Sequence, residues 1–225
     1  MQKSKRAVLL VGSPKGSDST SNALGAYLLD RLENKGLVCN KVMINQSLRT
    51  PENQTAMFQL IDNSDLIILA FPLYADCLHS QVIKTLEIIA NHEKGRSNLT
   101  RKNFVAIAKS GFPEAIHNNL AIRVCQNFAR QVGFAWAGGL AMGGGGMISG
   151  RSLQEIKGMA RNQLNALDIA ADALANGETI PEEAVESMSK LVIPRWMYSL
   201  FSNRAWKQQA KNFKAIKQIY NQPFK

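Results

Sequence analysis

Residues 7–11 read AVLLV and residues 12–21 read GSPKGSDSTS, and this stretch is the most informative part of the sequence about the fold. The first part is an apolar run of strand length, and the second is a loop of small residues. Apolar residues then recur at three- and four-residue spacing, at Ala23, Leu24, Tyr27, Leu28 and Leu32. This spacing predicts an amphipathic helix that ends near Gly36. A strand, a small-residue loop and a helix therefore follow one another directly.

The loop has the composition of an anion-binding site. The first turn of a helix carries backbone N–H groups without partners and the positive end of the helix dipole, so a phosphate placed there gains hydrogen bonds. Ser19, Thr20 and Ser21 add hydroxyl donors at this helix start, and Lys15 adds a positive charge. We expect a monophosphate to bind here. The alternative is an exposed turn whose serines only cap the helix.

Two other phosphate motifs do not fit the spacing of this loop. A Walker loop needs Gly-Lys-Ser/Thr at the positions that Ser17, Asp18 and Ser19 occupy. A dinucleotide fingerprint needs a second glycine where the chain has Pro14. A serine-rich monophosphate loop is the interpretation that remains.

Length and composition predict one substantial core with appendages, because the chain has 225 residues of which 45% are apolar. Its longest apolar runs, such as 66–73, are too short to span a membrane, and the N-terminal residues lack the apolar core of a signal peptide. We therefore expect a cytoplasmic location. The three cysteines are odd in number and far apart, which disfavours a disulfide framework or a metal site.

Positive charge is concentrated at the end of the chain. The net charge is +10, and from Lys190 onward there are eight Lys and Arg residues with no Asp or Glu. The preceding part is nearly neutral. A basic tail of this kind suits nucleic acid, a membrane surface or an acidic partner, although a solvated charged face is the commoner explanation.

Apolar runs alternate with helix-period segments along the chain, which predicts an α/β fold with a doubly wound parallel sheet. Five strands are expected at 6–11, 37–44, 65–71, 103–109 and 134–142. Helices are expected at 21–35, 55–63, 80–90, 114–132 and 152–176. The last of these would begin with a capping box at 152–155 and end at Gly177. Right-handed crossovers then give the strand order 2-1-3-4-5.

Unusual turns follow the first, third, fourth and fifth expected strands. The third strand runs into Pro72 and Tyr74, the fourth into SGFPE at 110–114, and the fifth into four glycines at 143–146. Each turn alone has a structural explanation, such as a hinge or a helix start. Ligands of such sheets bind beyond the carboxyl ends of the strands, so the turns together predict one shared site for a flat ligand.

These motifs resemble the flavodoxin-like NADPH-dependent FMN reductases, also called the NAD(P)H-dependent oxidoreductase family. The resemblance covers most of the chain and is firmest at 12–16, 19–21, 72–74 and 79–81. It implies a flavodoxin-like fold with bound FMN, whose phosphate lies on the first loop and whose ring lies between the next two turns. The implied cofactor-binding residues are Ser13, Lys15, Ser19, Thr20, Ser21, Pro72, Leu73, Tyr74, Ala75, Asp76, Ser110, Gly111, Phe112, Pro113 and Glu114.

In such a family NAD(P)H delivers hydride to the flavin, which reduces a small acceptor such as a quinone, a flavin or a nitroaromatic. No catalytic side chain, metal or iron–sulfur cluster is then expected, and Tyr74 is the expected stacking partner of the ring. Backbone N–H groups of Gly111, Gly143 or Gly144 are candidates to donate hydrogen bonds to the N1 and O2 edge of the flavin, which would stabilise its reduced anion. Lys109 is a candidate to stabilise the same negative charge. A homodimer is also implied.

Other functions stay open at this point. A flavodoxin-type electron carrier would bind FMN without a substrate of its own, but such carriers are usually acidic and this chain is basic. A nucleic-acid module needs aromatics interleaved with positive charge, which only the tail offers, so no nucleic-acid partner is expected. We expect an FMN-binding domain at 1–180 and a basic, aromatic-rich helical extension at 181–225. The extension would cover the flavin or a partner subunit, or contact a membrane surface weakly.

Overall fold

The computed structural model describes residues 5–96, 101–148 and 158–221. The chain forms two compact units, Met1–Val192 and Ile193–Lys225. The division falls later than the expected boundary at 180/181, because helix α7 (Glu182–Ser189) packs in the first unit. The Gln163 side chain donates hydrogen bonds to the carbonyls of Met188 and Lys190, which ties α7 and the residue after it to the first unit.

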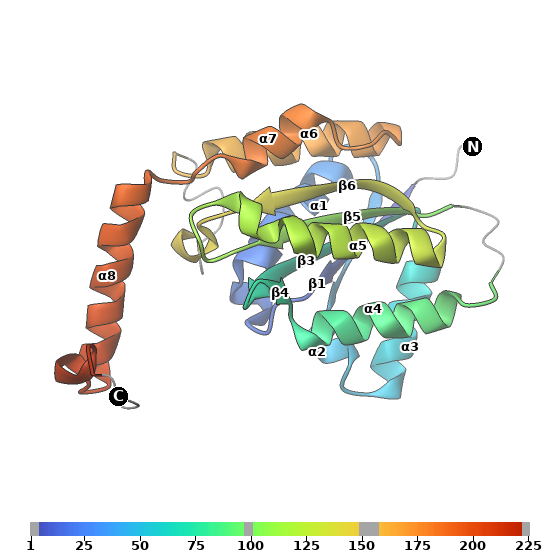
Figure 1. Cartoon of the computed structure of the whole chain (residues 1–225). Coiled ribbons are helices and arrows are strands. Elements are labelled where there is room, and N and C mark those ends of the chain that lie inside the picture. The colour runs from blue at the N-terminus through green and yellow to red at the C-terminus, as the bar shows by residue number, and fades with distance from the viewer. Residues whose placement is uncertain (1–4, 97–100, 149–157, 222–225) are drawn as a thin grey trace. The chain divides into compact units, whose positions relative to one another are not determined.

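Five parallel strands in the order β2-β1-β3-β5-β6 form the sheet of the first unit, and β1, β3, β5 and β6 are labelled in Figure 1. Their bounds are Val38–Met43 (β2), Arg6–Val11 (β1), Leu66–Tyr74 (β3), Asn103–Lys109 (β5) and Ala135–Met142 (β6). The predicted order is confirmed, since the two-residue strand β4 (Cys77–Leu78) lies off this path and pairs antiparallel with β3. The sequence did not predict β4.

Helices cover both faces of the sheet, because successive strand residues point to opposite sides. In β1, Ala7, Leu9 and Val11 belong to the core under α1 (Thr20–Glu33) and α6 (Arg161–Asn176), whereas Val8 and Leu10 face the opposite core. That second core is covered by α3 (Pro51–Asp62), α4 (Ser80–Glu93) and α5 (Asn119–Val132). Figure 1 shows the same layers. The doubly wound fold is confirmed.

Several expected boundaries move. The expected helix at 152–176 begins at Arg161, and the turn at 158–160 that precedes it is not helical. Its expected capping box at 152–155 lies outside the described residues. Its predicted end is confirmed, because Gly177 follows Asn176 with a φ of +85°. The helix expected at 114–132 opens with a 3₁₀ turn, η2 (Ala115–Asn118), before α5.

Three short elements complete the first unit. They are the short helix that directly follows β2 and two 3₁₀ turns beside the expected site: α2 (Ile44–Ser47), η1 (Gly16–Asp18) and η3 (Gly145–Met147). The second unit consists of α8 (Arg195–Asn212) and η4 (Ile216–Gln218), neither of which contains a buried residue. Among the described helices of the chain, none is both long and apolar enough to cross a membrane.

Candidate functional site

The four unusual turns lie at one edge of the sheet. Because β1, β3, β5 and β6 run parallel, their carboxyl ends meet there, and the turns that follow them lie on the same side of the first unit in Figure 1. The prediction that the sheet brings these turns together is confirmed.

The loop after β1 is closely packed at its start. The Gly12 amide donates a hydrogen bond of 2.8 Å to the Ala70 carbonyl of β3. A Cβ on Gly12 would lie 2.5 Å from a methyl group of Val82, so a larger residue would need the Val82 side chain to shift. The loop then turns through Gly16, which has a φ of +60° and donates its N–H to the Ser13 carbonyl.

The three hydroxyls at the start of α1 have different surroundings. Ser19 is the N-cap residue, since its Oγ accepts the Asn22 amide at 3.1 Å and donates to the Gly16 carbonyl. The Thr20 hydroxyl donates to the Gly145 carbonyl at 2.8 Å. The Ser21 Oγ is buried and has no hydrogen-bond partner among the described residues. A buried hydroxyl of this kind is free to bond to a water molecule or to a bound polar group.

Two lysines place positive charge near this loop. Lys109 is the last residue of β5. Its side chain lies against Gly145, since a Cβ added to Gly145 would be 2.5 Å from the Lys109 Cδ. Burial lowers the pKa of Lys109, and the positive charge of Lys15 lowers this pKa further. Gly145 also accepts the Thr20 hydroxyl, so the lysine, the glycine and the start of α1 meet. An anion bound there would relieve the repulsion between the two cations.

We expect Lys109→Met to stabilise the ligand-free protein near neutral pH, because it removes a partly buried charge and keeps the side-chain length. The pKa of Lys109 is lower in the folded than in the unfolded chain, so wild-type stability rises as pH increases from the folded pKa towards the ordinary value of 10.5. The advantage of the variant should therefore shrink with pH. Urea unfolding at about pH 7 and about pH 10 measures this. An advantage that grows with pH would contradict it.

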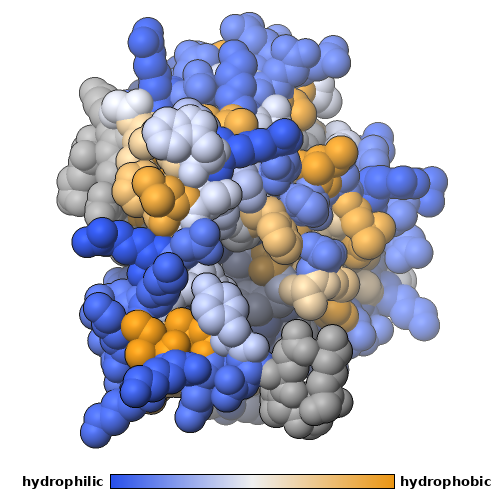
Figure 2. Space-filling view, turned by 60° about the vertical axis from the view of Figure 1, so that its left-hand side comes forward, coloured by the Kyte–Doolittle hydropathy of each residue, from blue (hydrophilic) through white to orange (hydrophobic). Residues whose placement is uncertain are grey.

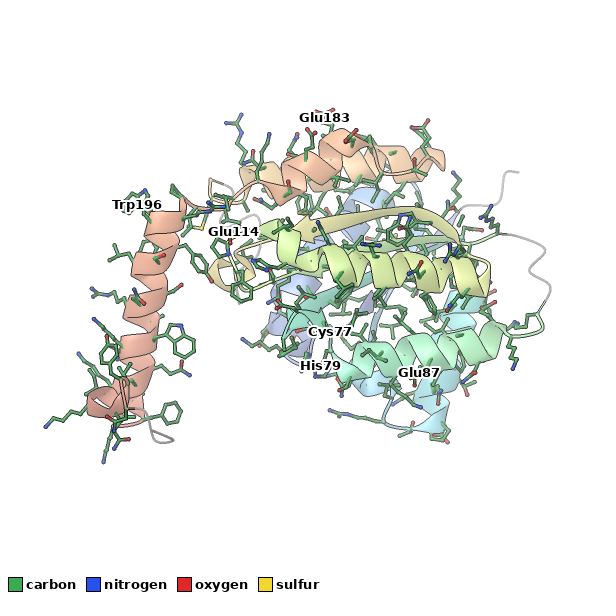
Figure 3. All side chains as sticks on the ribbon, in the orientation of Figure 1. Cys77, His79, Glu87, Glu114, Glu183 and Trp196 are labelled. Carbon is green, nitrogen blue, oxygen red and sulfur yellow. The ribbon has the colours of Figure 1, made fainter. Side chains whose placement is uncertain are left out.

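The turn after β3 forms a strained two-residue hairpin. Tyr74 pairs with Cys77, and the residues between them, Ala75 and Asp76, have φ values of +48° and +59°. Positive φ at both central positions is typical of a type I′ hairpin, but it is unfavourable for alanine. Tyr74 is 46% exposed, and its ring centroid lies 5.0 Å from that of His79. Figure 3 labels Cys77 on this hairpin and His79 after it, at the start of α4. Pro72 is buried and Leu73 is half-buried.

We expect Ala75→Gly to raise the free energy of unfolding by about 0.5–1 kcal/mol, because glycine adopts a positive φ without steric cost and this relief exceeds its greater entropy in the unfolded chain. Chemical denaturation gives the value. The matched control is Ala56→Gly, at an exposed position within α3, which should destabilise the protein instead. Equal destabilisation by both changes would show that Ala75 carries no strain.

Backbone hydrogen bonds join the turns after β5 and β6. The Gly144 amide donates to the Phe112 carbonyl at 2.5 Å, and the Gly145 amide donates to the Ser110 carbonyl at 2.9 Å. The expectation that Gly144 offers its N–H to a flavin edge is therefore wrong, because Phe112 already accepts it. A Cβ on Gly143 would overlap the Pro113 carbonyl oxygen.

Ring surface remains exposed on the turn after β5. Phe112 is 53% exposed, and its ring centroid lies 4.5 Å from that of His117. Ser110 is buried, Gly111 is exposed, and Pro113 and Glu114 are half-buried. Figure 3 shows Glu114 in this turn. Phe112 and Tyr74 thus offer partly exposed aromatic faces on two turns of the same sheet edge.

Asn118 is a residue of this site that the sequence analysis missed. It is fully buried, and its Nδ2, which carries two N–H donors, lies 3.0 Å from the Ala115 carbonyl, 3.1 Å from the Met142 carbonyl and 3.4 Å from the Ser110 hydroxyl. One side chain therefore links the turn after β5 to the end of β6. No short motif marks it, since the link to the end of β6 runs to the carbonyl of Met142, 24 residues along the chain.

A different cluster of ionisable groups lies where α3 and α4 end. Asp62, His92 and Glu93 have ligand atoms close enough together to hold a metal ion. However, the Arg96 guanidinium bonds to the Asp62 carboxylate at 3.1 Å, and the Phe58 ring stacks on His92 with centroids 4.0 Å apart. The arginine already supplies the cation that this carboxylate needs.

Strand order, doubly wound layers and a ligand edge beside the first loop define this protein as a member of the flavodoxin-like fold class. No protein-family model matches the sequence, and no curated protein matches it either. Solved structures do resemble the chain in fold.

Three of these structures illustrate the likeness. An NAD(P)H:quinone oxidoreductase from Methanothermobacter marburgensis has a TM-score of 0.57 and 16% identity, over 76% of this chain and 99% of that one. An FMN-dependent NADH-azoreductase from Bacillus anthracis str. Ames Ancestor, in complex with FMN, has a TM-score of 0.54 and 12% identity, over 76% and 100%. A flavodoxin from Streptococcus pneumonia TIGR4 has a TM-score of 0.52 and 13% identity, over 76% and 99%. At such identities the likeness shows the fold alone.

Proposed function

We propose that this protein is an FMN-dependent oxidoreductase that passes electrons from NAD(P)H to a small acceptor such as a quinone, a flavin or a nitroaromatic. The observation that carries the proposal is the buried Ser21 hydroxyl at the start of α1, which has no partner in the described part of the chain and lies at the sheet edge to which Lys15 and Lys109 also belong. The FMN-dependent azoreductase and the quinone oxidoreductase of the same fold support it.

The residues of the loop fit the phosphate of FMN. Ser13 and Ser21 are buried hydroxyls, Lys15 is an exposed cation, and Ser19 and Thr20 open the helix whose first N–H groups have no helical partner. Lys109 would add a second cation. Since the hydroxyls of Ser19 and Thr20 already donate within the protein, we assign the direct hydroxyl donation to Ser21.

The flat ring of the cofactor would lie against the turns after β3 and β5. Tyr74 and Phe112 provide exposed aromatic surface for stacking, and the left-handed turn at 75–76 holds Tyr74 in place. Bound FMN supplies the redox chemistry, accepting hydride from the nicotinamide and giving electrons to the acceptor. The protein binds and orients the ring and shields one side of it from water; no side chain needs to act as a nucleophile.

A flavodoxin-type electron carrier is the alternative function, and it shares the fold. It would bind FMN but would react with a protein partner and not with NAD(P)H. The net charge of +10 disfavours this function, because carriers of that class are usually acidic. A homodimer remains a prediction, which light scattering can test.

Ser21→Ala should weaken FMN binding about tenfold and leave riboflavin binding unchanged, because only FMN carries the phosphate that the hydroxyl would contact. The free energy of unfolding of the flavin-free protein should stay the same or increase, since the lost hydroxyl has no partner in the described structure. Fluorescence titration with each flavin measures the two affinities.

Ser17→Ala is the matched control for this test. Ser17 is exposed in the same loop, and its hydroxyl bonds to the Asp18 carboxylate. The control variant should bind FMN as the wild type does. If Ser21→Ala weakened FMN and riboflavin equally, the phosphate would not lie on this hydroxyl, and an unchanged FMN affinity would reject the assignment altogether.

A further inference from the structure

The second unit, Ile193–Lys225, exposes a large amount of apolar surface. Four aromatic residues of this unit are each more than two thirds exposed: Trp196 at 69%, Trp206 at 71%, Phe213 at 75% and Tyr220 at 83%. Leu200, Phe201, Ile216 and Ile219 are exposed as well. Isolated exposed apolar residues are common, but this density on one short helical unit indicates a binding surface.

The same unit carries only positive charge. Basic side chains recur along α8 and beyond it, at Arg195, Arg204, Lys207, Lys211, Lys214 and Lys217. No Asp or Glu occurs after Glu186. A surface of this kind fits an anionic partner.

A groove between α8 and η4 combines the two properties. Its volume is about 760 Å³. Apolar side chains of Leu200, Phe201 and Ile216 line it together with cationic ones. The cations are Arg204, Lys207 and Lys211. Such a groove fits a molecule with an apolar chain and an anionic head. Figure 2 shows hydrophobic and hydrophilic side chains next to each other on the surface that it presents.

We propose that this unit binds the surface of a bilayer that contains anionic phospholipid. Tryptophan and tyrosine are favoured at the boundary between headgroups and acyl chains, and lysines attract the negative leaflet. The exposed Trp196 and Trp206 would contact the headgroup region, and the lysines would face the anionic phosphates. This inference does not depend on the proposed redox function.

Two other occupants fit the unit less well. A second copy of the chain would bring two purely basic units together, and like charges oppose this contact. Nucleic acid would pair with the lysines and stack on the aromatic rings, but Leu200, Ile216 and Ile219 have no flat face on which a base can stack. Acyl chains accept aromatic and aliphatic side chains alike.

Sedimentation with vesicles tests the proposal on the full chain. We expect binding to phosphatidylcholine vesicles with about one third phosphatidylglycerol, and little binding to phosphatidylcholine alone. Salt raised from about 0.1 M to about 0.5 M should release the protein, because it screens the attraction. The tryptophan emission should shift to shorter wavelength on binding, since Trp196 and Trp206 leave water.

Two variants separate charge from apolar contact. Replacing Lys207, Lys211, Lys214 and Lys217 with Gln should weaken binding at least about 100-fold. The matched control replaces four exposed cations of the first unit with Gln: Lys41, Arg49, Lys94 and Arg123. It removes the same charge and should bind as the wild type. Trp196→Ser with Trp206→Ser keeps every charge and should weaken binding at least about tenfold.

Four results would overturn the proposal. The first is no binding to anionic vesicles at low salt, and the second is equal binding to neutral and anionic vesicles. The third is an equal loss in the lysine variant and its control. The fourth is a wild-type protein that does not bind vesicles but binds RNA or self-associates, with this binding lost in the lysine variant.

Discussion

Gly143→Ala should lower the free energy of unfolding by about 3 kcal/mol, because the added methyl group would overlap the Pro113 carbonyl oxygen. This contact is between two backbone segments, so no side-chain rotation can relieve it. The turns after β5 and β6 would have to separate, which would break the hydrogen bond from the Gly144 amide to the Phe112 carbonyl. FMN binding should weaken too, since Phe112 would move. Urea unfolding and flavin titration measure the two effects.

Gly146→Ala is the matched control in the same run of glycines. A Cβ on Gly146 would meet no atom of the described residues within 4 Å, and the position is exposed. This variant should keep the wild-type stability within about 0.5 kcal/mol. If Gly143→Ala were as mild as its control, the close approach of the two turns would be wrong.

Asn118→Ala should cost about 2–3 kcal/mol, because it removes the hydrogen bonds of the Asn118 Nδ2 and leaves a cavity in a fully buried position. It should also loosen the turn after β5, on which Phe112 stands. We therefore expect weaker binding of FMN and of riboflavin alike, unlike the phosphate-specific effect of Ser21→Ala.

Asn119→Ala provides the control for this change, since Asn119 is the neighbouring residue and is exposed. Its stability and flavin affinities should match the wild type. Denaturation and flavin titration of both variants test the prediction. A stable Asn118→Ala protein with unchanged affinity for both flavins would show that this amide does not hold the site together.

The strands could be predicted because buried parallel strands are apolar on both faces and therefore appear as continuous runs. The expected strands at 6–11 and 103–109 coincide with β1 and β5. The end of the long helix was predictable because Gly177 follows its last residue with a positive φ, which favours glycine. Strand β4 was missed because its turn at 75–76 lacks the glycine or asparagine that normally marks a type I′ hairpin.

The site was predictable as a meeting of turns, because the topology of a parallel sheet brings its carboxyl ends together. The contacts within it were not. The approach of Lys109 to Gly145 and the occupied Gly144 amide depend on loop conformation, which no residue spacing encodes. Ser21 resembles Ser19 and Thr20 in sequence, and only the structure shows that its hydroxyl alone of the three has no partner in the described part of the chain.

Anaerobic titration of the FMN-loaded protein with NADH and with NADPH distinguishes an NAD(P)H oxidoreductase from an electron carrier. The protein is first mixed with FMN, the bound fraction is separated, and the flavin absorbance is followed as each nucleotide is added. The proposed function predicts bound FMN that one or both nucleotides bleach rapidly. Bound FMN that neither nucleotide reduces would indicate an electron carrier, and failure to bind FMN at all would contradict the account.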